Sequence, residues 1–84
     1  MSKRIYIGNL PWKIDKKELE KIFSVFGKIE DAIVIINRHT GKSKGFGFVT
    51  FSEDKDARKA IDEMNGKEVL GRKILVKEAR PLGI

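Results

Sequence analysis

An octapeptide beginning at Lys44 alternates so regularly that it predicts a strand with two different faces: Lys-Gly-Phe-Gly-Phe-Val-Thr-Phe. Successive side chains of a strand point to opposite sides. Val49 and Phe51 therefore share a face suited to a core, whereas Phe46 and Phe48 share the other face with Lys44. Packing of Phe46 and Phe48 in the core is disfavoured, because the opposite face already supplies core residues. We therefore expect a sheet that is covered on one face only and exposes aromatic rings on the other.

Three further strands are predicted from alternating and β-branched residues, at 4–8, 29–37 and 72–77. In the first strand Ile5 and Ile7 suit the core, so Tyr6 faces away from it. In the last strand Ile74 and Val76 face inward in the same way. Tyr6 is thus expected on the open face that also carries the octapeptide rings.

Two helices are predicted by apolar residues at i, i+3, i+4 and i+7: Leu19, Ile22, Phe23 and Phe26 within 15–28, and Ala57, Ala60, Ile61 and Met64 within 52–68. Asp15 is the expected N-cap of the first helix, and Gly27 its C-terminal glycine. Ser52 or Asp54 is expected to cap the second helix, which Gly66 ends. Each helix therefore presents one apolar stripe to the sheet.

The order strand, helix, strand, strand, helix, strand predicts an α+β fold, the ferredoxin-like βαββαβ sandwich. Its four-stranded antiparallel sheet carries both helices on one face, and right-handed crossovers place the first and third strands at the centre. Tyr6 then lies beside Phe46 and Phe48. A chain of 84 residues has room for a single domain, 1–84, with one modest core over about 4–79.

The basic residues are concentrated outside the predicted helices. The formal net charge is +6, yet the helical segments hold eight Lys and Arg against nine Asp and Glu, and the remainder holds ten against three. Basic strands and loops beside exposed rings favour a polyanionic partner over a general solubility role. The absence of cysteine excludes disulfides and thiolate sites, and no apolar stretch is long enough for a signal peptide or membrane span. We expect a cytoplasmic protein, or a nuclear one if the chain is an excised eukaryotic domain.

Two segments resemble the signatures of the RNA-recognition motif family: the hexapeptide Ile5-Tyr-Ile-Gly-Asn-Leu10 and the octapeptide Lys44 to Phe51. The resemblance extends over residues 4–79 and includes Phe23-Ser-Val-Phe-Gly27 and Met64-Asn-Gly66. It implies non-catalytic binding of single-stranded RNA across the sheet, and of single-stranded DNA more weakly. A single bare domain resembles the short bacterial members of the family, although a piece of a longer protein would look the same.

The resemblance also implies roles for individual residues. Tyr6 and Phe48 would each stack on a base, Phe46 would pack against sugars or between nucleotides, and Lys44 would pair with phosphate. Family members often contact base edges at the positions of Asn9 and of the strand end from Lys77 to Arg80. Other cations could follow the phosphate backbone or be ordinary solvated surface charges: Arg38, Lys42 and Arg72.

Some residues remain open to more than one interpretation. Trp12 follows Leu-Pro in a turn, where shielding the edge of the core is favoured over stacking on a base. Ile33 and Ile35 are expected on the sheet surface, where they would contact RNA or form a protein contact, including self-association of an otherwise monomeric chain. His39 has no partner at metal-ligand spacing, so no metal or cofactor is expected.

Two other function classes compete with RNA binding. Some members of the same family bind peptides, usually after losing signature aromatic or basic residues that this chain retains. Small phosphatases share the topology, but the loop from Gly8 to Lys13 lacks the arginine that such an enzyme requires, and no nucleophile and base can be placed together. We therefore expect a binding domain and no enzyme.

Overall fold

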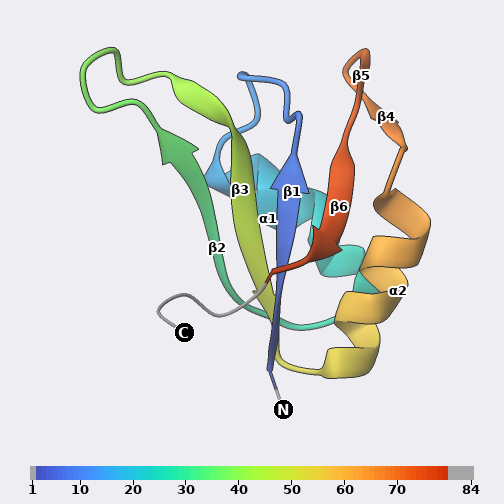
Figure 1. The fold of residues 1–84 in the computed structure, drawn as a ribbon. Helices are drawn as coiled ribbons and strands as arrows, with labels where there is room; N and C mark the ends of the chain where they lie inside the picture. Colours follow the sequence, from blue (N-terminus) through green and yellow to red (C-terminus); the bar gives the residue numbers. More distant parts are fainter. Residues whose placement is uncertain (1, 80–84) are drawn as a thin grey trace.

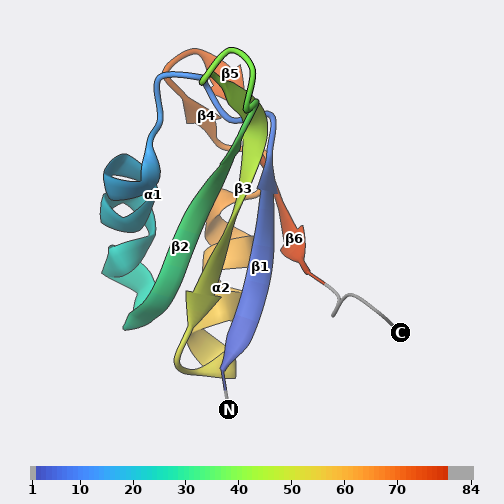
Figure 2. The same ribbon diagram turned by 90° about the vertical axis from the view of Figure 1, so that its left-hand side faces the viewer.

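The computed structural model describes residues 2–79, without the side chains of Ser43 and Lys44, and contains a four-stranded antiparallel sheet (Figure 1). Its strands are β1 (Lys3–Gly8), β2 (Ile29–Ile36), β3 (Ser43–Phe51) and β6 (Leu75–Glu78). They lie in the order β2-β3-β1-β6, so the strands expected at the centre are there. Figure 2 shows both helices on one side of this sheet, so that within residues 2–79 the other face is open. The predicted ferredoxin-like α+β fold is confirmed.

The last predicted strand, 72–77, is divided in two. Its first part, β5 (Arg72–Lys73), pairs with β4 (Glu68–Val69), and only β6 joins the main sheet. The reason is that β1 ends at Gly8, the partner of Leu75, so the chain before Leu75 has no strand of the main sheet to pair with. That segment instead forms a hairpin whose turn residues, Leu70 and Gly71, both have positive φ.

The helices are shorter than predicted. They span α1 (Lys16–Phe23), followed by a 3-10 turn (Ser24–Phe26), and α2 (Asp54–Met64). Asp15 is the N-cap of α1 as expected, since its carboxylate accepts the backbone N–H of Glu18 at 2.9 Å. Gly27 has an extended backbone rather than a left-handed one, whereas Gly66 has the left-handed φ of 82° expected where a helix ends.

The N-cap predicted for α2 is wrong. Glu53 occupies the cap position and makes no side-chain hydrogen bond there. The backbone N–H of Ser52 instead donates to the carbonyl of Lys28, and Asp54 lies within the first turn, with its carboxylate 3.7 Å from the Lys3 ammonium. The N-cap thus lies between the two predicted positions.

The core lies between the sheet and the helices. It contains the inward residues predicted for three strands and part of the apolar stripe of each helix: Ile5, Ile7, Val49, Phe51, Ile74, Val76, Leu19, Phe23, Ala57, Ala60 and Met64. The other stripe residues, Ile22, Phe26 and Ile61, are partly buried against it. Lys3 joins the central strand to its neighbour by an ion pair with Glu78 at 2.7 Å, and this hydrogen-bonded contact raises the pKa of Lys3. Within residues 2–79, no helix is long and apolar enough to cross a membrane.

Candidate nucleic-acid interface

Three aromatic rings form one cluster at the centre of the open face. Tyr6 of β1 lies directly opposite Phe48 of β3, with ring centroids 5.8 Å apart. Phe46 completes the cluster, at 5.9 Å from Tyr6 and 6.2 Å from Phe48. These distances are typical of favourable aromatic pairs. The tertiary structure therefore brings together the three rings that the sequence predicted.

The cluster belongs to a row that crosses all four strands of the sheet. Phe48 pairs with Ile33 of β2 on one side and Tyr6 on the other, and Tyr6 in turn pairs with Lys77 of β6. Because directly paired residues share a face, Ile33 lies on the open face as expected and is half-buried. Ile35 falls at an irregularity in the pairing of β2 with β3 and is also half-buried. The row thus has an apolar end at β2 and a cationic end at β6.

Gly8 makes room for the ring of Tyr6. A methyl group in place of its hydrogen would lie 2.7 Å from the Tyr6 hydroxyl oxygen and 2.8 Å from the ring. Such distances are well inside van der Waals contact, so the ring lies flat over Gly8 only because no side chain is there. The absence of a side chain at Gly8 therefore determines the position of the Tyr6 ring on the open face.

Two cations lie over the rings. The Arg4 guanidinium carbon is 5.3 Å from the centroid of Phe48, and the Lys77 ammonium is 5.4 Å from that of Tyr6. Both distances fall within the range of cation–π attraction. Lys77 was predicted as a site residue, whereas Arg4 was missed, although strand alternation already places Arg4 on the face of Tyr6. Tyr6 and Phe48 therefore each have a positive charge over the ring.

A hollow of about 750 Å³ lies along this cluster and is lined by Tyr6, Phe48, Lys77, Glu78 and Ala79. Its size falls within the range of ligand sites in proteins. Glu78, the acidic residue in the lining, pairs with Lys3 at 2.7 Å. The negative charge on the rim is thus partly compensated, which keeps the hollow suited to an anionic ligand.

Asn9 and Arg72 lie together beyond the end of β1. The Arg72 guanidinium donates to the side-chain oxygen of Asn9, and the Asn9 amide donates to the carbonyl of Lys73 at 2.7 Å. Both side chains are exposed, but the amide of Asn9 already has a partner at each end. An amide has two N–H donors and two acceptor lone pairs, so Asn9 keeps one donor and one acceptor site for the predicted contact with a base edge.

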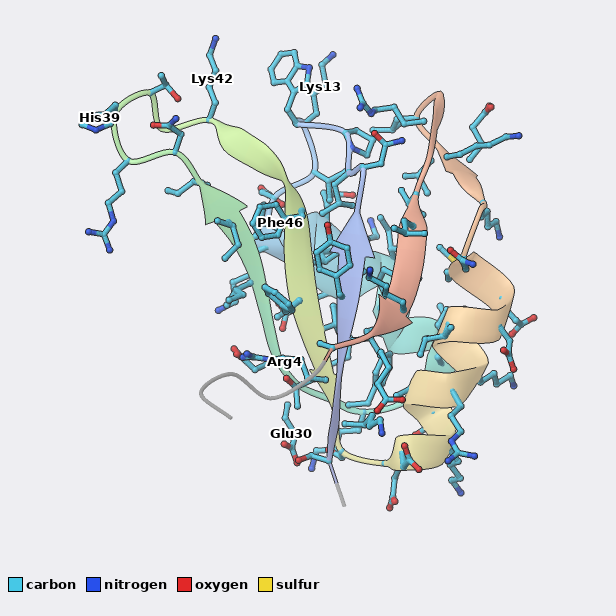
Figure 3. The ribbon with its side chains drawn as sticks, in the orientation of Figure 1. Arg4, Lys13, Glu30, His39, Lys42 and Phe46 are labelled. Atoms are coloured by element: carbon cyan, nitrogen blue, oxygen red, sulfur yellow. The ribbon has the colours of Figure 1, made fainter. Side chains whose placement is uncertain are left out.

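The remaining predicted cations lie at the margin of the sheet or outside the described part. Arg38 and Lys42 are exposed in the loop between β2 and β3, and Figure 3 shows Lys42 extending from that loop away from the sheet. Arg38 and Lys42 are thus separate from the ring cluster and remain predicted phosphate contacts. Arg80 and the side chain of Lys44 lie outside the described residues.

Trp12 is exposed, contrary to the expectation that it shields the core. Its side chain is 64% exposed, and the Lys13 ammonium lies 5.9 Å from the centroid of its ring. The core edge is closed instead by Leu10 and Ile14, which are 3% and 4% exposed. Leu10 and Ile14 therefore cover the part of the core that Trp12 was expected to shield.

The described residues offer no metal site. No group of three or more His, Asp and Glu side chains within residues 2–79 is close enough to hold a metal ion. His39 lies at the tip of the loop between β2 and β3, where Figure 3 shows it directed away from the sheet.

An open sheet with clustered rings and cations defines a class of binding domain, and comparison with known proteins identifies the family. Residues 5–75 match the family model described as RNA recognition motif. The chain therefore belongs to the RNA recognition motif family.

Several plant proteins are similar in sequence. Glycine-rich RNA-binding protein 10 of Brassica napus is 51% identical over 95% of this chain and 47% of its own length. A 29 kDa chloroplastic ribonucleoprotein of Arabidopsis thaliana is 49% identical over 90% of this chain and 22% of its own length. The chain spans about half the length, or less, of these curated relatives.

Solved structures agree closely with the fold. The RNA-binding protein PG1 superposes with a TM-score of 0.89 at 43% identity, covering 94% of this chain and 98% of that one. A chain of the Sxl-lethal protein/RNA complex superposes with a TM-score of 0.91 at 30% identity, covering 99% of this chain and 50% of its own length.

Proposed function

We propose that this chain binds single-stranded RNA on the open face of its sheet. The observation that carries the proposal is the mutual contact of Tyr6, Phe46 and Phe48 on the face opposite to α1 and α2. The family, the RNA-binding names of the relatives, and the protein/RNA complex among the structural neighbours support RNA as the partner.

Base stacking supplies most of the affinity in this proposal. Tyr6 and Phe48 each take one base, and Phe46 packs against sugars or between the two nucleotides. Stacking contributes roughly 1 to 3 kcal/mol per base, so two or three rings support useful binding without base-specific contacts. Ile33, which pairs with Phe48, extends the apolar surface for a base or sugar at the edge of the sheet.

Cations supply phosphate contacts around these rings. Lys77 and Arg4 lie over the rings of Tyr6 and Phe48 in the free chain. A base that stacks on one of these rings displaces the cation from the ring face, and the displaced cation can then contact phosphate. Lys44, Arg38 and Lys42 follow the backbone of the nucleic acid mainly through charge. Asn9, Arg72 and the chain from Lys77 to Arg80 add hydrogen bonds near the strand ends.

Replacing Phe46 and Phe48 together by alanine tests the proposal. Both side chains lie on the open face and not in the core, so the fold should remain while RNA affinity falls roughly ten-fold or more. Val25→Ala is a matched control, because Val25 is 77% exposed in the helical layer. The Val25→Ala variant should bind RNA with the same affinity as the unmodified chain.

Selection from a random RNA pool, with single-stranded DNA as competitor, supplies the ligand for this measurement. We expect enrichment of single-stranded RNA and weaker retention of DNA. If the double variant binds RNA as tightly as the unmodified chain, the proposed stacking on Phe46 and Phe48 is wrong. If the pool yields no enriched RNA, a protein partner at Ile33 and Ile35 is favoured instead.

A further inference from the structure

Two loops expose large apolar side chains toward one hollow beyond the end of β1. Trp12 is 64% exposed in the loop after β1, and Leu70 is 69% exposed at the tip of the β4–β5 hairpin. The hollow has a volume of about 450 Å³ and is lined by Pro11, Trp12, Lys13, Leu70 and Arg72. This volume is within the range of small-ligand sites.

The loop that carries Trp12 is firmly held on both sides. The backbone N–H of Ile14 donates to the carbonyl of Pro11 at 3.0 Å, which closes a tight turn with Trp12 and Lys13 at its centre. The N–H of Leu10 donates to the carbonyl of Gly45 at 2.8 Å, and Leu10 and Ile14 are buried. The indole is therefore presented to solvent by an anchored support.

The opposite wall of the hollow carries an unusual turn residue. Leu70 has a φ of 48°, at a hairpin position where glycine or asparagine is normally preferred because a larger side chain is strained. Its side chain contributes to the wall of the hollow rather than to the core. Strained residues of this kind cluster at ligand sites.

The hollow is connected to the ring cluster. Arg72 is tied to Asn9, the residue that follows β1, and Asn9 is tied to Lys73. Between Asn9 and Tyr6, the pair of Gly8 with Leu75 continues the open face, and Leu75 is 45% exposed. Figures 1 and 2 both show the loop after β1 and the β4–β5 hairpin at the same end of the sheet.

The chemistry of this lining fits a nucleotide. It combines an aromatic face with the cations Lys13 and Arg72, and none of the described residues that line it is a carboxylate. A second hollow that also touches Trp12 has one cation, Lys16, but its lining includes the carboxylate of Asp15 and two isoleucines of β2. Aromatic rings stack on bases of any sequence, and nearby cations pair with phosphate.

We infer that the hollow between Trp12 and Leu70 binds one further nucleotide of an RNA strand that continues past the end of β1. The base stacks on Trp12 and packs against Leu70, while Lys13 and Arg72 contact its phosphate. This inference rests on the proposed RNA binding of the sheet and extends the length of RNA that the domain binds.

Oligouridylates lengthened by one nucleotide at a time test the inference, because Trp12 is the sole tryptophan and its fluorescence reports directly on the hollow. Short oligomers that cover only the rings should leave Trp12 emission unchanged. Beyond a threshold length, one added nucleotide at either the 5′ or the 3′ end should quench the emission and raise the affinity. Trp12→Ala should lower the affinity for the longer oligomers roughly five-fold or more and leave that for the short ones unchanged.

Leu70→Ala and Ile36→Ala form a matched pair of variants that keep the fluorophore. Leu70→Ala should reduce the affinity gained when the oligomer is lengthened past the threshold. Ile36 is 53% exposed and lines the second hollow, so Ile36→Ala should leave this gain in affinity unchanged. If Trp12→Ala keeps the full length dependence, or if emission never changes while the Phe46 and Phe48 variant loses binding, the inference fails and the sheet site stands. Failure of every oligomer to bind the unmodified chain would overturn both.

Discussion

Gly8→Ala should weaken RNA binding without weakening the fold. The added methyl group would lie 2.7 Å from the Tyr6 hydroxyl oxygen and 3.0 Å from the ring carbon that bears it. Contact between such atoms normally requires about 3.5 to 4.0 Å, so the outer end of the ring must move by roughly 1 Å or rotate away. The ring can do so because it is half-buried on the open face.

The expected magnitude follows from the number of platforms disturbed. Only Tyr6 is displaced, so the loss is that of one stacked base, roughly 1 kcal/mol or more, or at least about five-fold in affinity. The free energy of unfolding should stay the same or rise by up to roughly 1 kcal/mol, since glycine is unfavourable inside a strand. Opposite directions for affinity and stability distinguish this mechanism from general damage.

A double-mutant cycle with Tyr6→Ala provides the assay. Affinity for the selected RNA is measured by fluorescence anisotropy for both single variants and for the combined variant, and stability by urea unfolding. If Gly8 acts through the Tyr6 ring, Gly8→Ala should have no further effect once the ring is absent. An equal loss of affinity in both backgrounds, or no loss in the unmodified one, would refute this account of Gly8.

Two further predictions concern the helix cap and the charged end of the ring row. Asp15→Ala should lower the free energy of unfolding by about 1 kcal/mol, because the N–H of Glu18 loses its acceptor. Urea denaturation measures this change, and RNA affinity should be unaffected. Lys77→Gln should weaken binding to all RNA sequences and reduce the logarithmic salt slope by roughly 0.7, as for one single-strand phosphate contact. A loss confined to particular sequences would instead assign Lys77 to base recognition.

Local sequence patterns were sufficient to predict most of the main sheet and the face on which the aromatic rings lie. Alternation assigned Tyr6, Phe46 and Phe48 to the open face because the period of a strand depends only on backbone geometry. The N-cap at Asp15 was predictable for a similar reason, since its partner, Glu18, is three residues away. The start of α2 could not be predicted in this way, because its N-cap, Glu53, makes no side-chain hydrogen bond to a nearby backbone N–H.

The sequence by itself therefore determined the order of the helices and the main-sheet strands, the face of each of those strands and the family. Only the tertiary structure decided which neighbours those residues have. Asn9 meets Arg72 and Lys73 across more than sixty residues of chain, and Trp12 is exposed because Leu10 and Ile14 close the core beside it. Such contacts depend on how separate segments pack, which no local period encodes.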